Sequence, residues 1–507
     1  MTPSRFTPLY LYGWVFLCAA LLYGVSCAPG LLWQDSGLIQ YRVLNQDVAG
    51  SLGLAVSHPL HILAAMGTKI LPWGPVATKV NLLSSVAGAV AVANVLLLVR
   101  LWTGRPAAAL VAALTLALSH TFWQHASMAE TYTLWTALFT AELIVLLQYT
   151  RTGRRGLLYG LGLLNGLAVA VHVLGVIPLA VYAVYFGLLC RRGLVRPRDL
   201  GLFALAWVAG CLPYEVLILQ RLVETGDLRG TLCSALFGSR WQDEVLNTVI
   251  TARMVKENLL LWLLNFPTPN GILAVLGSAL LARRARSEPF GVVVLALTVL
   301  TLAFAFRYTV PDRYAFFIPF YVMVSLLAGW GAHIVLGRKG HVRWAAGAMV
   351  LAALVPVAVY AAAPWVARKA GVQIPTRGDV PYRDDLSFFL RPWKTGYTGA
   401  DRFAAEALGS AAPHAVLYAD LTTIGPLLVT QQTRGIRPDV AIVNPVVLHP
   451  ASPPWNAQVL PGLLETRPVY VASCRSGNCP QFVRADYDLV EAGLLWQVRA
   501  RGSGRAD

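Results

Sequence analysis

Apolar segments of membrane-crossing length alternate with short polar connections through most of this chain, from residue 9 to residue 366. A helix needs about 20 consecutive, mainly apolar residues to cross the hydrocarbon layer of a bilayer. Because the segments recur at this length, we expect a mainly α-helical transmembrane bundle of about eleven spans. The expected spans are residues 9–27, 77–100, 106–122, 129–149, 156–171, 174–190, 200–219, 257–282, 289–306, 314–336 and 344–366.

The composition agrees with this pattern. Hydrophobic residues make up 56% of the 507 residues and charged residues only 13%, which indicates a multi-pass membrane protein. The formal net charge of +16 would suggest nucleic-acid binding in a soluble protein. Many arginines, however, lie in the short connections between apolar segments. Membrane topology therefore explains them, and the expected surroundings are membrane lipids with no nucleic-acid partner.

Five basic connections set the expected orientation of the chain. Because basic residues are enriched in cytoplasmic loops, all five are expected in the cytoplasm, with the amino terminus inside and the carboxyl terminus outside an inner or plasma membrane. A cleaved signal peptide is the alternative interpretation of residues 1–27, since Val25–Ala28 loosely resembles a processing site. The connections contain Arg100 and Arg105; Arg151, Arg154 and Arg155; Arg191, Arg192, Arg196 and Arg198; Arg283, Arg284 and Arg286; and Arg338, Lys339 and Arg343.

Three segments on the expected outer side are long enough to carry chemistry. Residues 28–76 form a large first outer loop within a transmembrane domain of residues 1–366, and residues 220–256 form a second loop. From residue 367 onward Pro, Asp and Arg are spread through the chain. Residues 367–507 are therefore expected to fold as an extracytoplasmic domain with a core of its own.

The pattern within this tail predicts a small α/β domain. Residues 400–408 have the periodicity of a helix, whereas residues 415–419, 440–443 and 469–472 are short apolar strands separated by turn residues.

No metal site is expected in the tail. Cys474 and Cys479 enclose a polar loop without the further ligands that zinc needs, so they are candidates for a local disulfide. Asp384 and Asp385 superficially resemble an acidic metal motif, but we interpret them as solvated surface or as a contact with the catalytic face.

Asp35 stands out because it follows the first apolar segment almost immediately. A carboxylate held at the mouth of an apolar bundle is a candidate for a functional site. The alternative is a helix cap or a turn, since Asp35-Ser36-Gly37 also suits that role.

Several motifs, in this order and spacing, resemble those of the protein O-mannosyltransferase-like membrane family, a branch of the glycosyltransferase C superfamily. They are Trp33–Gly37, Ser57–Pro59, Ser119–Tyr132, Tyr308–Tyr314 and Gly435–Val440. The resemblance spans nearly the whole chain and is strongest over residues 30–180.

The resemblance implies an enzyme that moves a sugar from a polyprenyl-phosphate carrier to an acceptor hydroxyl at the outer face, with inversion at the anomeric carbon. In the superfamily a carboxylate of the first outer loop is the general base, which is the role expected of Asp35. Mannose is the sugar that the resemblance favours, and the acceptor is a protein, a glycan or a lipid. No cofactor is expected beyond the lipid-linked donor, and no divalent metal.

Four further residues are expected to bind substrate. Glu130 and Tyr132 lie where an outer loop re-enters the membrane in an aromatic and histidine-rich stretch, and an acid there can bind sugar or acceptor hydroxyls. Glu130 could equally pair with a nearby histidine or an arginine. His58 belongs to the second motif, and His172 joins two short spans, where a structural role in the bundle is the alternative.

Arg307 and Arg313 bracket the late outer loop and are expected to bind the carrier phosphate. Guanidinium groups bind phosphate oxygens in pairs of hydrogen bonds and can reach a headgroup from a membrane boundary. The alternatives are a snorkelling anchor or an ion pair between Asp312 and Arg313.

A transporter or lipid flippase with an outer ligand-binding domain is the alternative function, and a sensor is a third. Transporters commonly contain internal repeats and place polar residues near the midplane. Here the ionisable residues gather at the outer boundary and the two halves do not look alike, which favours the enzyme.

Overall fold

A helical bundle forms most of the structure, a computed structural model that describes residues 7–501 apart from 239, 311, 338–341, 373, 375–376, 378 and 448–452. Within these residues eight helices are long and apolar enough to cross a membrane, and two bent pairs raise the number to ten. The shorter apolar helix α8 (Arg155–Val171) occupies the remaining expected position. All eleven expected segments are therefore helical. The eight are α1 (Thr7–Ser26), α4 (Val76–Thr103), α7 (Tyr132–Thr152), α9 (Val176–Arg191), α10 (Pro197–Thr225), α15 (Pro289–Arg307), α16 (Ile318–Val335) and α17 (Val342–Lys369). A short turn precedes two of them, Val173–Gly175 before α9 and Ala315–Phe317 before α16.

The continuous span expected at residues 257–282 is wrong, because this segment is broken. It consists of α13 (Ala252–Asn265) and α14 (Asn270–Arg283), which are bent by 109°. Pro267 and Pro269 lie between them. Proline lacks a backbone donor and clashes with the preceding helical turn, so two prolines in five residues end the helix.

A second break divides the span expected at residues 106–122. Helices α5 (Pro106–Ala117) and α6 (His120–Ala126) are bent by 70°. The backbone N–H of Thr121, in the first turn of α6, has no partner within its own helix and donates to Oδ1 of Asn265 at 2.8 Å. Asn265 is the last residue of α13, so the two breaks contact each other.

The hydroxyl of Tyr360, on α17, lies between the two breaks. It is within hydrogen-bonding distance of the carbonyl oxygens of Leu264 (2.9 Å) and Leu118 (3.2 Å). Lipid offers no partner for a free carbonyl, so irregular backbone at this depth has to be satisfied from within the protein. The fully buried phenol has one proton to donate, which the carbonyl oxygens on the two sides share.

Close backbone contact joins α8 to α10. A Cβ added at Gly166 would clash with the carbonyl oxygen of Trp207, and one added at Gly210 with that of Leu163. Gly162, one turn before Gly166, meets Phe203 in the same way. Small residues four apart let transmembrane helices approach this closely, and van der Waals packing then holds them.

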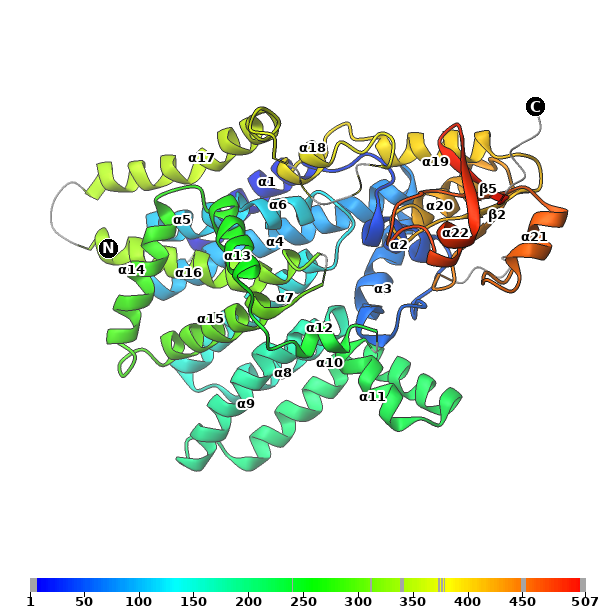
Figure 1. Cartoon of the computed structure of the whole chain (residues 1–507). Coiled ribbons are helices and arrows are strands. Elements are labelled where there is room, and N and C mark those ends of the chain that lie inside the picture. Colours follow the sequence, from blue (N-terminus) through cyan, green and yellow to red (C-terminus); the bar gives the residue numbers. More distant parts are fainter. Residues whose placement is uncertain are drawn as a thin grey trace.

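The tail folds as a sheet with helices, at the end of the molecule opposite the amino terminus (Figure 1). The strand order is β2-β1-β3-β5-β4, with β1 parallel to both β2 and β3 and the last two strands antiparallel. The three strands and the helix expected from the sequence are confirmed. The strands are β1 (Val416–Tyr418), β2 (Ala441–Val443), β3 (Val469–Val471), β4 (Tyr487–Ala492) and β5 (Leu495–Ala500), and the helices are α18 (Asp385–Leu390), α19 (Gly399–Ser410), α20 (Ile424–Arg434), α21 (Leu460–Thr466) and α22 (Gln481–Asp486).

Two features of the tail differ from expectation. The hairpin of β4 and β5 was not expected, because its outward residues leave no continuous apolar run. Cys474 and Cys479 are free thiols in the structure, so the disulfide between them is absent.

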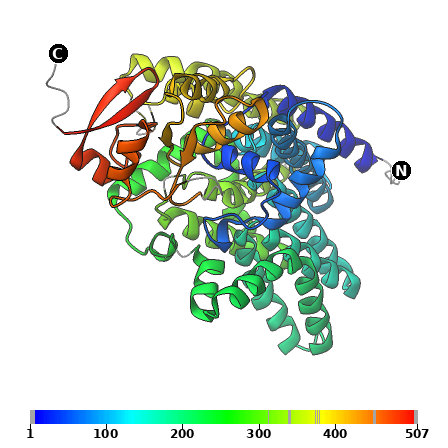
Figure 2. The same cartoon turned by 90° about the vertical axis from the view of Figure 1, so that its right-hand side faces the viewer.

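Of the two long loops expected on the outer side, the first lies between the bundle and the sheet, and α11 (Leu228–Phe237) of the second lies at the lower edge of the molecule in Figure 1. Figure 2, which looks at the molecule from the sheet end, shows the first outer loop beside the tail. The helices of the two loops are α2 (Gln34–Leu44), α3 (Pro59–Gly67), α11 (Leu228–Phe237) and α12 (Gln242–Leu246). Arg338 and Lys339 of the fifth basic connection lie outside the described residues.

Replacement of Gly166 by Ala is expected to destabilise the bundle by about 1–3 kcal/mol, because the new methyl group meets the α10 backbone. Gly160→Ala is the matched control, since a Cβ there meets nothing within 4 Å. Thermal unfolding in lipid nanodiscs, followed by tryptophan fluorescence, measures both. Equal midpoints for the two variants would contradict the close contact.

Candidate functional site

Helix α2 presents Asp35 in its first turn. Trp33 precedes the helix in an extended conformation, and Gln34 begins it with a φ of 54°. A carboxylate in the first turn interacts favourably with the helix dipole. The Asp35 side chain is nevertheless exposed and lines a cavity, so its oxygen atoms are free to meet a ligand.

The cavity has a volume of about 190 Å³ and gathers residues from six separate parts of the chain. Five of the seven residues proposed from the sequence line it, although up to 137 positions separate them. They are Asp35, His58, Glu130, Tyr132 and His172. The late outer loop contributes Tyr308, Val310, Asp312 and Phe316, and the tail contributes Leu421 and Val447.

Three carboxyl groups share this cavity, those of Asp35, Glu130 and Asp312. Burial raises the pKa of Glu130 well above its ordinary value, and the neighbouring charges of Asp35 and Asp312 raise it further. Burial and then the charge of Asp35 raise the pKa of Asp312 to about 7. The pKa of Asp35 is also raised, by burial. Of the three side chains, that of Asp35 is exposed, whereas those of Glu130 and Asp312 are half-buried.

Hydroxyl groups hold Glu130 in place. The Ser36 hydroxyl, next to Asp35, donates to Oε1 of Glu130 at 3.1 Å. The backbone N–H of Glu130 donates to the Ser84 hydroxyl at 3.0 Å. Because Ser36 follows Asp35 on α2, its hydrogen bond fixes the position of Glu130 relative to Asp35.

Two histidine rings form one wall of the cavity. His58 and His172 lie with ring centroids 4.7 Å apart, and Tyr132 lies 5.2 Å from His172. Nδ1 of His58 is 3.0 Å from the carbonyl oxygen of Val171, and a carbonyl only accepts, so this nitrogen carries the proton. Burial, with the charge of Arg42, lowers the pKa of His58 to about 3. The rings are neutral hydrogen-bonding groups.

Arg307 and Arg313 lie outside this cavity. Nη1 of Arg307 donates to the carbonyl oxygens of Val245 (2.6 Å) and Asn247 (2.7 Å). Nη2 of Arg313 donates to Oε2 of Glu257 at 3.1 Å. The ion pair of Arg313 is therefore with Glu257, which corrects the alternative pairing with Asp312 and leaves Asp312 facing the cavity.

Arg42 is a cavity-lining cation that the sequence interpretation missed. Its guanidinium donates to four carbonyl oxygens of the first outer loop, among them those of Val48 and Ser57, both at 2.7 Å. Burial lowers its pKa to about 10. The signal that could have found it is its place on α2, seven residues and so two turns after Asp35.

The described residues contain no group of three or more His, Cys, Asp or Glu side chains arranged to hold a metal ion. The chemical groups of the cavity are those of its carboxyl, imidazole and phenol side chains. That the reaction needs no metal stays a prediction.

The tail packs directly on α2. Gly37 and Gly425 lie so close that a Cβ on Gly425 would be 2.5 Å from the Gly37 carbonyl carbon. The backbone N–H of Gln34 donates to the carbonyl oxygen of Thr422 at 3.2 Å. Leu38 of α2 also belongs to the same hydrophobic core as Phe403 of the tail. The tail therefore shares its core with the loop that carries Asp35.

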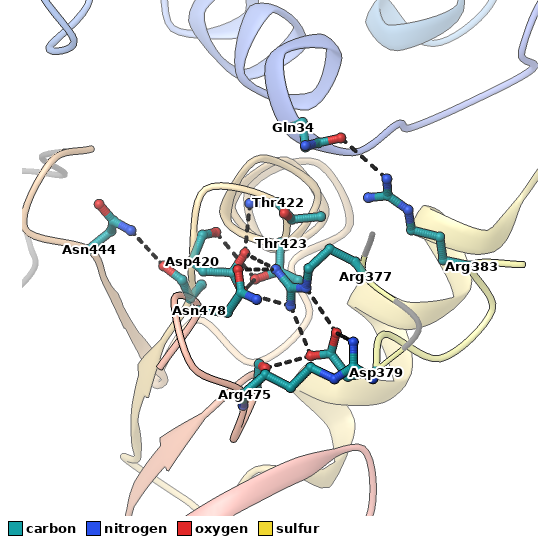
Figure 3. A network of polar contacts seen from close by, with 12 residues as sticks. Gln34, Arg377, Asp379, Arg383, Asp420, Thr422, Thr423, Asn444, Arg475 and Asn478 are labelled. Atoms are coloured by element: carbon teal, nitrogen blue, oxygen red, sulfur yellow. Dashed lines mark hydrogen bonds and ion pairs between the residues drawn. The ribbon is translucent and has the colours of Figure 1, made fainter. Parts of the chain in front are cut away.

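An ion-pair network supports this junction from the linker after α17 (Figure 3). Nη1 of Arg377 donates to Oδ1 of Asp420 at 2.5 Å, and Nε donates to Oδ1 of Asp379 at 3.0 Å. Nη2 of Arg383 donates to the side chain of Gln34 at 3.3 Å. The arginines hold the linker, the end of β1 and the residue before Asp35 together.

Comparison with known proteins identifies relatives of this arrangement. Residues 48–192 match the family model described as Protein O-mannosyl-transferase TMEM260 N-terminal domain. The crystal structure of ArnT from Cupriavidus metallidurans bound to undecaprenyl phosphate is similar in fold, with a TM-score of 0.58 and 13% identity over 99% of this chain and 100% of that one. The archaeal oligosaccharyltransferase AglB from Archaeoglobus fulgidus, in complex with an inhibitory peptide and a dolichol-phosphate, gives a TM-score of 0.47. Its sequence identity is 15%, and the match covers 78% of this chain and 61% of that one. No curated protein sequence matches the chain.

Gly425→Ala is expected to loosen α2, because the added methyl group forces α20 away from Gly37. Hydrogen exchange of the α2 amides should become faster by about tenfold. Gly409→Ala, in the same domain but with open space around it, is the control. Unchanged exchange in α2 for both variants would mean that the tail does not hold this helix.

Proposed function

We propose that this chain, a membrane glycosyltransferase of the glycosyltransferase C fold related over residues 48–192 to the protein O-mannosyltransferase family, moves a sugar from a polyprenyl-phosphate carrier to an acceptor hydroxyl at the outer face. The observation that carries the proposal is the accessible carboxylate of Asp35 in a cavity at one end of the bundle. Mannose, favoured by the sequence resemblance, is the first sugar to test.

Asp35 acts as the general base. As the acceptor oxygen bonds to the anomeric carbon, Asp35 takes its proton, and the bond from that carbon to the phosphate oxygen breaks on the opposite face. The products are the inverted glycoside and the polyprenyl phosphate, which keeps the electron pair of the broken bond. A raised pKa suits a base, because it strengthens the carboxylate as a proton acceptor.

Glu130 and Asp312 then serve as protonated neighbours. The pKa of Glu130 is raised well above its ordinary value and that of Asp312 to about 7, so we assign Glu130 the protonated state at neutral pH and Asp312 the protonated state below about pH 7, with Asp35 as the ionised acid. They and the neutral rings of His58 and His172 offer donors and acceptors for sugar hydroxyls, and Tyr132 offers an aromatic face.

The carrier phosphate requires a cation. Arg307 and Arg313 remain the prediction from the sequence resemblance, although their guanidinium groups are already engaged outside the cavity. Arg42 is the better placed candidate, since it lines the cavity and its four carbonyl bonds leave one of five donors free.

The basic connections support a single cytoplasmic end. Nη1 of Arg151 donates to the carbonyl oxygen of Leu101, and Nη1 of Arg105 to that of Leu336, both at 2.9 Å. Arg155 pairs with Asp199 at 3.5 Å. Trp102 contacts Phe290, which follows the fourth connection, with ring centroids 5.0 Å apart. The five connections thus meet at one end, and the positive-inside rule makes that end cytoplasmic.

Reporter tags inserted after Arg154 or Arg196 should therefore report the cytoplasm, and tags after Gly53, Asp243 or Gly477 the outside. Compartment-specific labelling in intact cells measures this. A tag after Arg196 that is labelled from outside would overturn the proposed orientation.

Asp35→Asn should lower sugar transfer by roughly two orders of magnitude or more, because the amide keeps the shape but accepts no proton. Carrier binding should be unchanged. Asp243→Asn is the control, an exposed aspartate of the second outer loop that does not line the cavity. In the parent, the rate should fall as the pH drops through the raised pKa of Asp35. A folded Asp35→Asn variant that transfers sugar at the parent rate would remove Asp35 from the mechanism and leave Glu130 as the next acid to test.

A further inference from the structure

A second, larger cleft lies on the tail domain. It has a volume of about 890 Å³, which is within the size range of small-molecule sites. Tyr418 ends β1, Pro445 follows β2 and Ser476 follows β3, so the cleft opens at the carboxyl ends of the three parallel strands. Since β2 and β3 lie on opposite sides of β1, the chain connections reverse direction here. Ligands of open α/β sheets bind at this position.

Aromatic rings form the floor of the cleft. Tyr418 and Trp455 stack with centroids 5.2 Å apart and planes at 24°, and Phe482 lies 6.2 Å from Trp455. Trp455 is only 8% exposed, so packing on its other sides fixes the ring that lines the cleft.

The rim is polar and nearly uncharged. Gln458 and Gln481 are exposed and line the cleft, as do Asn456 and Ser476, whereas Arg484 is the one charged side chain among the described lining residues. Amide side chains donate and accept hydrogen bonds at once. Burial raises the pKa of the Cys479 thiol to about 12, so that lining group is neutral as well.

This combination matches a saccharide. A pyranose ring has an apolar C–H face that packs on an aromatic ring, and its hydroxyl groups need partners that both donate and accept. A peptide would be bound most simply along a free strand edge, but the cleft lies at the carboxyl ends of the strands, and no residue of the edge strand β2 itself lines it. The volume accommodates more than one sugar ring.

The cleft adjoins the cavity that contains Asp35. Pro445 lines the cleft and Val447, two residues later, lines the cavity. Likewise, Tyr418 lines the cleft and Leu421, three residues later, lines the cavity. The cleft and the cavity are therefore bounded by neighbouring residues of the same two loops of the tail.

We propose that the cleft of the tail domain is a saccharide-binding site, which holds the distal sugars of a glycan acceptor whose terminal hydroxyl enters the Asp35 cavity. The acceptor half of this statement rests on the proposed transferase function. The binding half does not, because it concerns the tail alone.

The test is binding of soluble linear trisaccharides of mannose, glucose and N-acetylglucosamine to the full chain in lipid nanodiscs, measured by isothermal titration calorimetry. Detergents with sugar headgroups are avoided, because they would compete. At least one trisaccharide should bind, and the double variant Gln458→Ala, Gln481→Ala should weaken it about tenfold, as expected for the loss of two hydrogen bonds. Trp455→Leu, which removes the aromatic ring that would pack on the sugar, should also weaken it.

Gln497→Ala is the matched control, a glutamine on β5 of the same domain that bonds Arg499 and does not line the cleft. Asp35→Asn should bind the trisaccharide like the parent while failing to transfer sugar. Saccharide binding without any transfer by the parent would refute the transferase and keep the site. Transfer without binding of any of the three trisaccharides, binding of an unglycosylated Ser/Thr-rich peptide in their place, or binding insensitive to the cleft variants would overturn the site.

Discussion

Helix α2 is held from two sides, and the site depends on this constraint. Ile39 and Val43 pack into a core formed with α3 and α4, whereas Leu38 and Tyr41 pack into the core of the tail. A short helix in an outer loop has little stability alone, so its position comes from these two contacts. The position of Asp35 relative to the other cavity residues is therefore a property of the whole chain.

The cavity confines three acids within a small volume, and their mutual repulsion gives them different states. Each ionised carboxylate makes the next ionisation harder, so proton affinity is divided unequally over Asp35, Glu130 and Asp312. The same chemical group can then act as a proton acceptor at one position and as a hydrogen-bond donor at another. Neutral histidines beside them add no charge that would cancel this difference.

The sequence predicted the bundle well, because membrane crossing imposes one length and one composition on every span. The break between α13 and α14 was visible in Pro267 and Pro269, but the bend between α5 and α6 was not, since partners on distant helices allow it. Asp35, His58, Glu130 and Tyr132 were selected with the help of the ordered motifs, and His172 by its position between two short spans. An ion pair of Asp312 with Arg313 was the alternative for that arginine, because nothing in the local sequence shows that Glu257 takes that place.

The contact between Gly37 and Gly425 also has a consequence in time. The two residues are nearly 390 positions apart, so at ~5–20 residues per second roughly 20–80 s of synthesis separate them. The helix that carries Asp35 is synthesised early, and the segment that supports it is synthesised almost last. Until then the nascent chain has its bundle helices but lacks the contact that fixes α2, so a chain that stalls or is cut before Gly425 has no support for Asp35 from the tail.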